Sequence, residues 1–183
     1  MPAPTCAIVD DNGQSLPDGE VGHLAVKAPH PVMFLGYFNR PDATREKYAG
    51  DWLLTGDTGL RDSDGYYWFR GRADDVITSA GCRIGPAEIE EALLGQPAVQ
   101  NVAVIGVPDA LRTEVIKAFV VLATGFVGND ELIAQLQDHV HTRLARHEVP
   151  RHIESIDALP MATTHKILRR ELRARERLKM APG

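Results

Sequence analysis

The stretch 71–91 reads GRADDVITSAGCRIGPAEIEE and concentrates residue types that suit a binding segment better than a core. It contains three glycines, one proline, two arginines and the adjacent pair Asp74 and Asp75. Gly81 and Gly85 have no Cβ, so another group can approach the backbone closely there. Because neighbouring like charges gain nothing in a core, we expect both aspartates at the surface.

Regular elements on either side must hold this stretch in place. Four consecutive aromatic residues at 66–69 predict a strand with one buried face. After the stretch, Pro86 has a backbone angle suited to the first turn of a helix, which the apolar spacing extends over 87–94. Acidic residues crowd the start of that helix, where the helix dipole favours negative charge.

Other polar residues have simpler interpretations when judged alone. A calcium loop starting at Asp62 would need a glutamate at its twelfth position, where Ala73 stands, so Asp62 to Gly65 is interpreted as a turn. Cys82 has no neighbouring base and is not expected to be a nucleophile. We predict no metal site, because the following histidines share no ligand spacing and are interpreted as structural or surface residues: His23, His30, His139, His141, His147 and His152.

Turn signals and apolar patterns divide the chain into short elements. The expected strands are 5–9, 22–28, 32–37, 52–55, 66–69, 99–107, 116–122 and 152–156, with a strand pair inside 73–86. The expected helices are 41–48 with Asp42 as cap, 87–94, a long one from the cap Asn129 to about His147, and a basic one from Ile167. We therefore predict an α+β protein with a β-rich segment at 1–72 and a compact α+β domain at 73–183.

Length and composition are those of an ordinary globular protein. The chain has 183 residues, of which 44% are hydrophobic and 25% charged. Its net charge of −5 argues against a general nucleic-acid surface, and no stretch is apolar enough for a membrane span. With two distant cysteines and no secretory signal, a cytoplasmic location is expected. The basic stretch 166–179 has two interpretations, a solvated helix face or a patch for an anionic ligand or partner.

The order and spacing of these residues resemble the joint between the large and small domains of the adenylate-forming enzymes. Within them the chain is most similar to the AMP-forming acyl-CoA synthetases, the medium-chain type in particular, from about residue 4 to 173. The resemblance implies that Asp57, in Leu-Thr-Gly-Asp, accepts hydrogen bonds from the ribose hydroxyls of the adenylate. On spacing alone Asp57 would be a turn residue.

Four further roles follow from the same resemblance. Arg72 and Arg83 would contact the adenylate, with Arg83 facing a phosphate, and Asp74 would be the hinge about which the small domain rotates. Lys166, in the stretch LPMATTHKILRREL at 159–172, would be the catalytic lysine. Its ammonium would offset the negative charge that builds up as the substrate carboxylate attacks phosphorus.

The resemblance also implies a coenzyme A site. Ser79, Ala80, Gly81 and Cys82 are similar to the segment that lines the pantetheine tunnel, and Arg112 matches an arginine on the coenzyme A side. As single residues, Arg83 and Arg112 would more simply be surface ion-pair partners. Three positions depart from the family: Cys82 replaces an aromatic residue, whereas Thr113 and His165 replace glycines.

The chain resembles only the last third of a family enzyme. The loop that holds the ATP phosphates, the adenine motif and the acyl pocket are absent from the sequence, so we expect no adenylation by this chain alone. The implied reaction joins a small carboxylate to coenzyme A using ATP with Mg²⁺. One alternative is a stand-alone, non-catalytic chain, either a gene remnant or a coenzyme A-binding or dimerising module, in which exposed apolar edges favour a homodimer. The other is the end of a peptide-synthetase adenylation domain.

Overall fold

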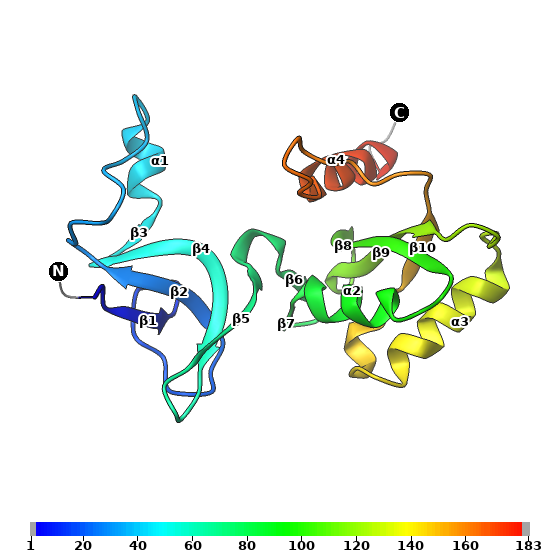
Figure 1. Cartoon of the computed structure of the whole chain (residues 1–183), viewed down its shortest axis with the longest axis horizontal. Helices are drawn as coiled ribbons and strands as arrows, with labels where there is room; N and C mark the ends of the chain where they lie inside the picture. Colours follow the sequence, from blue (N-terminus) through cyan, green and yellow to red (C-terminus); the bar gives the residue numbers. More distant parts are fainter. Residues whose placement is uncertain (1–2, 181–183) are drawn as a thin grey trace. The chain divides into compact units, whose positions relative to one another are not determined.

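A computed structural model describes residues 3–180. The chain folds into two compact units, Met1–Asp74 and Asp75–Gly183 (Figure 1). The division falls after Asp74, two residues beyond the predicted boundary at Arg72. Each unit has its own five-stranded sheet, and helices are concentrated in the second unit. The predicted α+β class is confirmed.

The first unit is an antiparallel sheet arranged around one long strand. Its strands are β1 (Cys6–Val9), β2 (Gly22–Lys27), β3 (Tyr48–Ala49), β4 (Trp52–Arg61) and β5 (Tyr67–Arg72), joined by a short helix α1 (Pro41–Arg45). The order is β1-β2-β4-β3, and β5 also pairs with β4. Strand β4 was predicted to end at Thr55 but continues to Arg61. Asp57 therefore lies inside this strand and pairs with Arg72 of β5.

The predictions for residues 32–37 and 41–48 were wrong. Residues 32–37 form turns and loop and not a strand, because their backbone donors are bound locally: Met33 donates to the carbonyl of His30, and Tyr37 donates to the Thr44 hydroxyl. The helix at 41–48 ends at Arg45, and its N-cap is Arg40, so Asp42 lies in the first turn.

The aromatic strand also differs from expectation. Tyr66, Tyr67, Trp68 and Phe69 are 69%, 40%, 57% and 66% exposed, so the predicted buried face is absent from this part of the described chain. The turn before it is confirmed: the Asp62 carboxylate accepts hydrogen bonds from the amides of Asp64 and Tyr66. The side chain of Trp68 donates to the same carboxylate, and this hydrogen bond is the main reason that the pKa of Asp62 lies below its ordinary value.

The second unit is a sheet with helices on both faces. Its strands are β6 (Ile77–Ser79), β7 (Cys82–Ile84), β8 (Val99–Asp109), β9 (Thr113–Leu122) and β10 (His152–Ser155), and its helices are α2 (Pro86–Leu94), α3 (Asp130–His141) and α4 (Arg169–Met180). Strand β9 pairs with β8 along its length, with β10 in parallel, and with β6 at its start. The element order is the predicted one.

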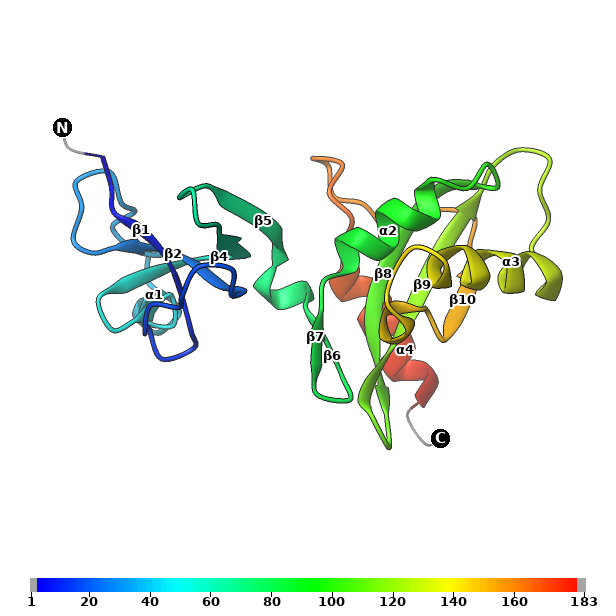
Figure 2. The same ribbon diagram turned by 90° about the horizontal axis from the view of Figure 1, so that it is seen from below.

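Alternating residues of β8 and β9 separate the second unit into two apolar layers. Val102 and Val104 pack with residues of α2 and α3, whereas Ala103 and Ile105 pack with Leu172 of α4. Figure 2 shows α2 and α3 on one face of this sheet and α4 on the other. Both faces of β8 are buried, which explains its nearly continuous apolar sequence.

The boundaries of two helices needed correction. Asn129 caps α3 as predicted, its side chain accepting a hydrogen bond from the Leu132 amide at 2.8 Å, but α3 ends at His141 and not near His147. A separate turn of 3₁₀ helix, Arg146–Glu148, follows it. Helix α4 begins at Arg169, two residues after the expected start at Ile167. None of the helices in residues 3–180 is long and apolar enough to cross a membrane.

Candidate functional site

Asp57 and Arg72 form an ion pair between neighbouring strands. They are direct partners on β4 and β5, and the Arg72 Nη1 donates to the Asp57 Oδ1 at 2.8 Å. Gly56 has a φ of +86°, and a Cβ at this position would lie 2.8 Å from the Arg72 Nη2. The glycine of the Thr-Gly-Asp motif therefore leaves space for the guanidinium as well as adopting the left-handed conformation.

The same arginine also contacts the predicted hinge residue. Its Nε donates to the Asp74 Oδ1 at 3.3 Å. The hydrogen bond to Asp57 is the largest influence on Arg72 and, against partial burial, raises the pKa of its guanidinium above the ordinary value. Both pairs are open to solvent, with Arg72 about half exposed. The sequence-predicted residues Asp57, Arg72 and Asp74 therefore lie together in the first unit as a charged, accessible cluster.

The proposed coenzyme A residues come together in the second unit. Strands β6 and β7 form a hairpin in which Ser79 pairs with Cys82, and the turn residues Ala80 and Gly81 have φ angles of 49° and 83°. The Ala80 amide donates to the Arg112 carbonyl at 3.0 Å, which joins this hairpin to the β8–β9 turn. Ser79 is buried, whereas the turn and Arg112 are exposed.

A cleft of about 650 Å³ lies beside this junction. Ser79 and Arg112 form part of its wall, and two further arginines, two histidines and one aspartate contribute the other ionisable groups. Its other lining residues are Val115, Ile116, Gln137, Asp138, His141, Arg146, His147, Val149, Pro150 and Arg151. Sequence reasoning treated the histidines singly and did not find this set, because its members come from four segments that only the sheet brings together.

Arg83 belongs to a different unit from the other predicted adenylate residues. It is exposed on β7 of the second unit, whereas Asp57 and Arg72 belong to the first. Its register partner on β6 is Thr78, one residue before the start of the Ser79–Cys82 turn. Its local neighbours are therefore the residues of the predicted coenzyme A segment.

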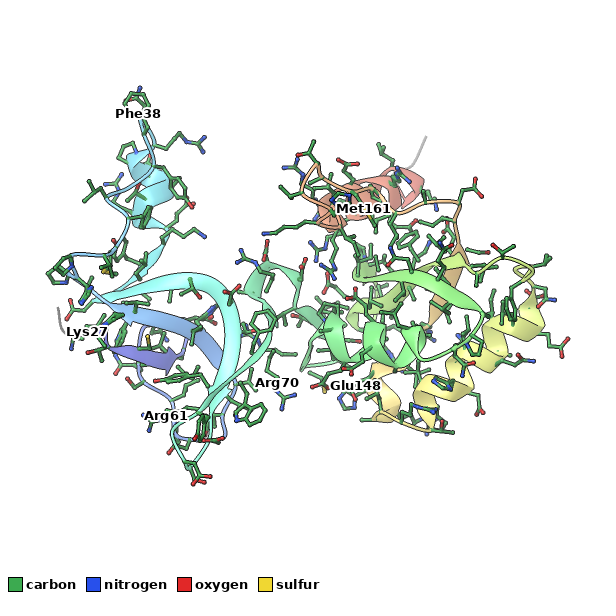
Figure 3. All side chains as sticks on the ribbon, in the orientation of Figure 1. Lys27, Phe38, Arg61, Arg70, Glu148 and Met161 are labelled. Carbon is green, nitrogen blue, oxygen red and sulfur yellow. The ribbon has the colours of Figure 1, made fainter. Side chains whose placement is uncertain are left out.

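Lys166 lies in a tight exposed loop before α4. The Ala162 amide donates to the Lys166 carbonyl and the Leu168 amide to the Pro160 carbonyl, and Met161 bridges to Ile167 as in a small antiparallel ladder. Figure 3 shows Met161 labelled in this segment. The loop closes through His165, which has a left-handed φ of 59°, a conformation that glycine adopts without steric cost. The Lys166 side chain is exposed.

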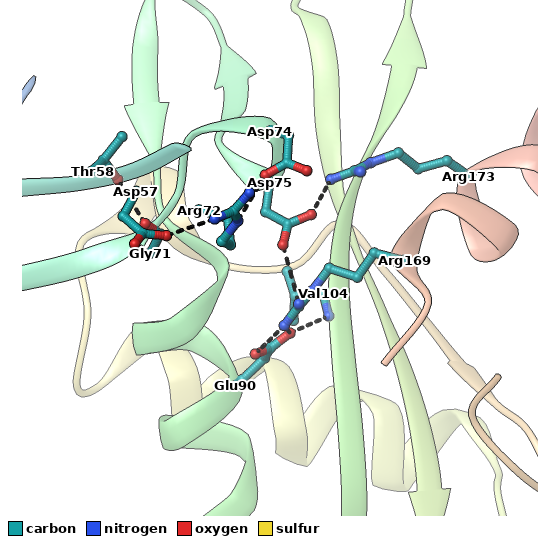
Figure 4. A network of polar contacts seen from close by, with 10 residues as sticks. All are labelled: Asp57, Thr58, Gly71, Arg72, Asp74, Asp75, Glu90, Val104, Arg169 and Arg173. Carbon is teal, nitrogen blue, oxygen red and sulfur yellow. Dashed lines mark hydrogen bonds and ion pairs between the residues drawn. The ribbon is translucent and has the colours of Figure 1, made fainter. Parts of the chain in front are cut away.

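The expected surface position of Asp75 was wrong. Asp75 is 9% exposed, and its carboxylate accepts hydrogen bonds from two arginines of α4, Arg169 at 3.1 Å and Arg173 at 2.9 Å (Figure 4). Charge repulsion from Asp74 does not decide its position, because two guanidinium groups compensate the buried carboxylate. Sequence reasoning missed this network, although an acidic pair and a basic helix in one domain were a usable signal.

The basic helix is likewise not simply solvated. Lys117, 9% exposed on β9, donates to Glu154 and to Glu176 of α4. Burial opposes ionisation of the two glutamates, but hydrogen bonds from Lys117 and Lys179 outweigh it and hold the pKa of both below the ordinary value. Both ends of α4 are thus paired with carboxylates of the second unit.

Proteins with similar sequences and folds show which domain the chain carries. Residues 88–166 match the family described as AMP-binding enzyme C-terminal domain. The chain carries that domain of the adenylate-forming enzymes. It is 47% identical over 174 residues to the human mitochondrial acyl-coenzyme A synthetase ACSM2B, with 92% of this chain and 30% of the relative covered.

Two solved structures of this family have the same fold. The anthranilate CoA ligase AuaEII in complex with anthranoyl-AMP is 37% identical with a TM-score of 0.86, and the alignment covers 98% of this chain and 34% of the ligase. MatB from Rhodopseudomonas palustris with bound ATP is 32% identical with a TM-score of 0.84, covering 96% of this chain and 34% of MatB. The chain therefore spans about one third of the length of these adenylate-forming proteins.

Proposed function

We propose that this chain is the C-terminal part of an ATP-dependent, AMP-forming acyl-CoA synthetase. The observation that carries the proposal is the junction of the Ser79–Cys82 hairpin with Arg112 beside a basic cleft. Coenzyme A presents phosphates and a narrow thiol arm. Arginine and histidine side chains suit the phosphates, and a turn without bulky side chains at Ala80 and Gly81 leaves space for the arm.

The first unit supplies groups suited to the nucleotide. Asp57 uses one carboxylate oxygen for Arg72, and a carboxylate has further acceptor capacity for a pair of ribose hydroxyls. Arg72 provides a permanently charged donor for the ribose or phosphate. In this proposal Lys166 serves adenylation with ATP and Mg²⁺, rotation follows at Asp74, and Arg83 faces a phosphate.

The coenzyme A site can be tested on the chain itself by calorimetric titration. We expect coenzyme A to bind, and Arg112→Ala to weaken binding at least tenfold. Arg170→Ala is the matched control, because Arg170 is an exposed arginine of the same unit that does not line the cleft. Equal affinities of the two variants, or no binding to the unchanged chain, would contradict this assignment.

The role of Lys166 requires the chemistry of a complete enzyme. In a full-length enzyme reconstituted around this chain, we expect Lys166→Ala to abolish most adenylation, measured as ATP–pyrophosphate exchange, while thioester formation from supplied acyl-adenylate continues. Such a difference arises because only the first step requires positive charge beside the reacting phosphate. Equal loss of both steps would exclude the assigned role.

A non-catalytic coenzyme A-binding module is the second candidate. The cleft and every residue that lines it belong to the second unit, so binding there needs none of the sequence that the longer relatives have in addition. Acyl-CoA synthesis by the chain would exclude this candidate. The candidate would be favoured if the chain binds coenzyme A but catalyses no reaction, either alone or after a large domain is added. Transfer to a carrier protein in place of coenzyme A would instead indicate a peptide-synthetase origin.

The proposal includes two properties of the chain as a whole. We expect a cytoplasmic location, which cell fractionation would test against the mitochondrial location in the name of ACSM2B. We also expect self-association, because Leu35 and Phe38 are 104% and 91% exposed in the first unit, together with the aromatic residues of β5. Sedimentation velocity over a concentration series would detect a homodimer.

A further inference from the structure

We propose that Arg169 is a positioning residue for Lys166 and that it acts through Asp75 and Glu90. The inference rests on the proposed function, in which Lys166 is the lysine presented to the nucleotide. It adds a residue outside the reacting groups, three positions after the lysine, whose contacts determine where the base of the lysine's loop is held.

Arg169 joins two carboxylates that come from different elements. Its Nη1 donates to the Asp75 Oδ2 at 3.1 Å, and its Nη2 lies 2.8 Å from both carboxylate oxygens of Glu90 (Figure 4). The side chains of Arg169, Asp75 and Glu90 are only 19%, 12% and 14% exposed. A planar guanidinium can serve two acceptors at once in a fixed geometry, which an ammonium cannot do.

Both carboxylates are themselves held by further contacts. Glu90, on α2, accepts a hydrogen bond from the Val104 amide of β8 at 2.8 Å. Asp75 accepts a second hydrogen bond from Arg173, one turn further along α4. The two acidic and two basic side chains balance in charge. Arg169 is therefore connected to α2, to the central sheet and to the first residue of the second unit.

The connection from Arg169 to Lys166 is short and closed. Leu168 donates its amide to the Pro160 carbonyl, and the Lys166 carbonyl accepts the Ala162 amide, so the loop and the start of α4 share one hydrogen-bonded base. On the sheet side, Ile167 packs into the second apolar layer. A shift of Arg169 would consequently move the hydrogen-bonded ends of the loop that carries Lys166.

The network is not needed merely to dock α4. Leu172 is fully buried against the sheet, and Lys117 and Lys179 hold Glu176 further along the helix. The Nε of Arg169 is buried without a hydrogen-bond partner among the described residues. The two carboxylates therefore determine the orientation of this side chain, although that orientation leaves the Nε–H unbonded. Buried ion pairs give little net stability compared with apolar packing, and specificity of position is the better explanation.

Asp75 is the first residue of the second unit, so its contact with Arg169 links the start of α4 to the boundary between the units. Asp74 is paired with Arg72 inside the first unit, and the next residue, Asp75, is held by α4 inside the second. Arg169 thus fixes Lys166 relative to the point at which the second unit begins. In a rotation at Asp74, the lysine would move with its unit as one body.

The test uses nuclear magnetic resonance on the 183-residue chain. Amide exchange and {¹H}–¹⁵N nuclear Overhauser effects are measured for Ala162, His165 and Leu168 in the unchanged chain, in Arg169→Met and in Arg169→Lys. Lys179→Met is the matched control, because it removes ion pairs at the other end of α4. We expect at least tenfold faster exchange of the three loop amides in Arg169→Met, a smaller increase in Arg169→Lys, and less than a twofold change in the control.

Amides in the middle of β8 and β9 provide the second reference. They are expected to change less than twofold in both Arg169 variants. Faster exchange across the whole unit, or unchanged loop amides in a folded variant, would overturn the proposal. If Arg169→Met does not fold, Arg169→Lys decides by the same criterion. Because no nucleotide or turnover enters this measurement, its failure is distinguishable from failure of the proposed function, which the coenzyme A titration tests.

Discussion

Thr113 is a β-branched residue in the left-handed backbone region, and replacing it with glycine is expected to stabilise the second unit. Its φ is 70°, and its side chain is exposed at the start of β9. The left-handed region costs a residue with a Cβ roughly 1.5 kcal/mol. Glycine removes that cost but gives the unfolded chain about 0.4–1 kcal/mol more conformational freedom. The net expectation is a stabilisation of about 0.5–1 kcal/mol.

The expected change in melting temperature is about 2–5 °C for a unit of this size. Trp52 and Trp68 both lie in the first unit, so tryptophan fluorescence would report on the wrong part. Far-ultraviolet circular dichroism is suitable, because the long helices belong to the second unit. Gly125→Ala is the matched control. Gly125 has a φ of +93°, and no atom lies within 4 Å of the place that a Cβ would occupy, so alanine there should lower the melting temperature through its backbone angle alone.

The two variants must therefore shift the transition in opposite directions. If Gly125→Ala destabilises and Thr113→Gly has no effect or also destabilises, Thr113 is not strained in the way its backbone angle indicates. The threonine would then have a stabilising role that offsets its backbone angle, such as one of its hydroxyl beside Arg112.

Three further predictions concern the second unit. Asn129→Ala should lower the free energy of unfolding by about 1 kcal/mol, measured by urea titration, because the helix cap of α3 is lost. Leu172→Ala should cost about 2–5 kcal/mol by leaving a cavity under α4, whereas Leu178→Ala, at a position 77% exposed, should change stability by less than about 0.5 kcal/mol. Because the pKa values of Glu154 and Glu176 are depressed in the folded state, the stability they add is present above their ordinary pKa of 4.5 and lost as the pH falls through the lower folded values. Urea titrations across that range should show a shallower loss in Lys179→Met.

Sequence patterns predicted most elements where the local signal and the packing agree. The apolar run of β8 and the cap at Asn129 are examples, since each depends on residues close together in the chain. Helix α3 ends at His141 with Thr142 as its C-cap, although Leu144 beyond it still packs against the core. The exposed aromatic residues of β5 could not be predicted, because burial depends on what covers a strand and not on its own composition.

In the candidate site too, some features follow from the local sequence and others depend on the packing of distant segments. The resemblance assigned Asp57 and Arg72 to the adenylate and Asp74 to the hinge. The cross-strand register brings Asp57 and Arg72 into contact, and Arg72 also donates to Asp74. The junction of the Ser79–Cys82 hairpin with Arg112 was implied only by family roles, and it depends on a hydrogen bond between segments about thirty residues apart. No local pattern indicates the cleft lining, because helix α3 and the start of β9 contribute to it from separate parts of the chain.

The prediction for Asp75 was wrong because it considered only the neighbouring residues in the sequence. Two adjacent aspartates repel each other, and either one alone would avoid the interior. The fold resolves this by giving each carboxylate a different cation, Arg72 for Asp74 and the arginines of α4 for Asp75. Adjacent charges can then belong to two separate networks, one in each unit. Neutral residues at these two positions would remove the ion pairs between α4 and the start of the second unit. Each of the two networks needs one of the carboxylates, and this need outweighs the repulsion between them.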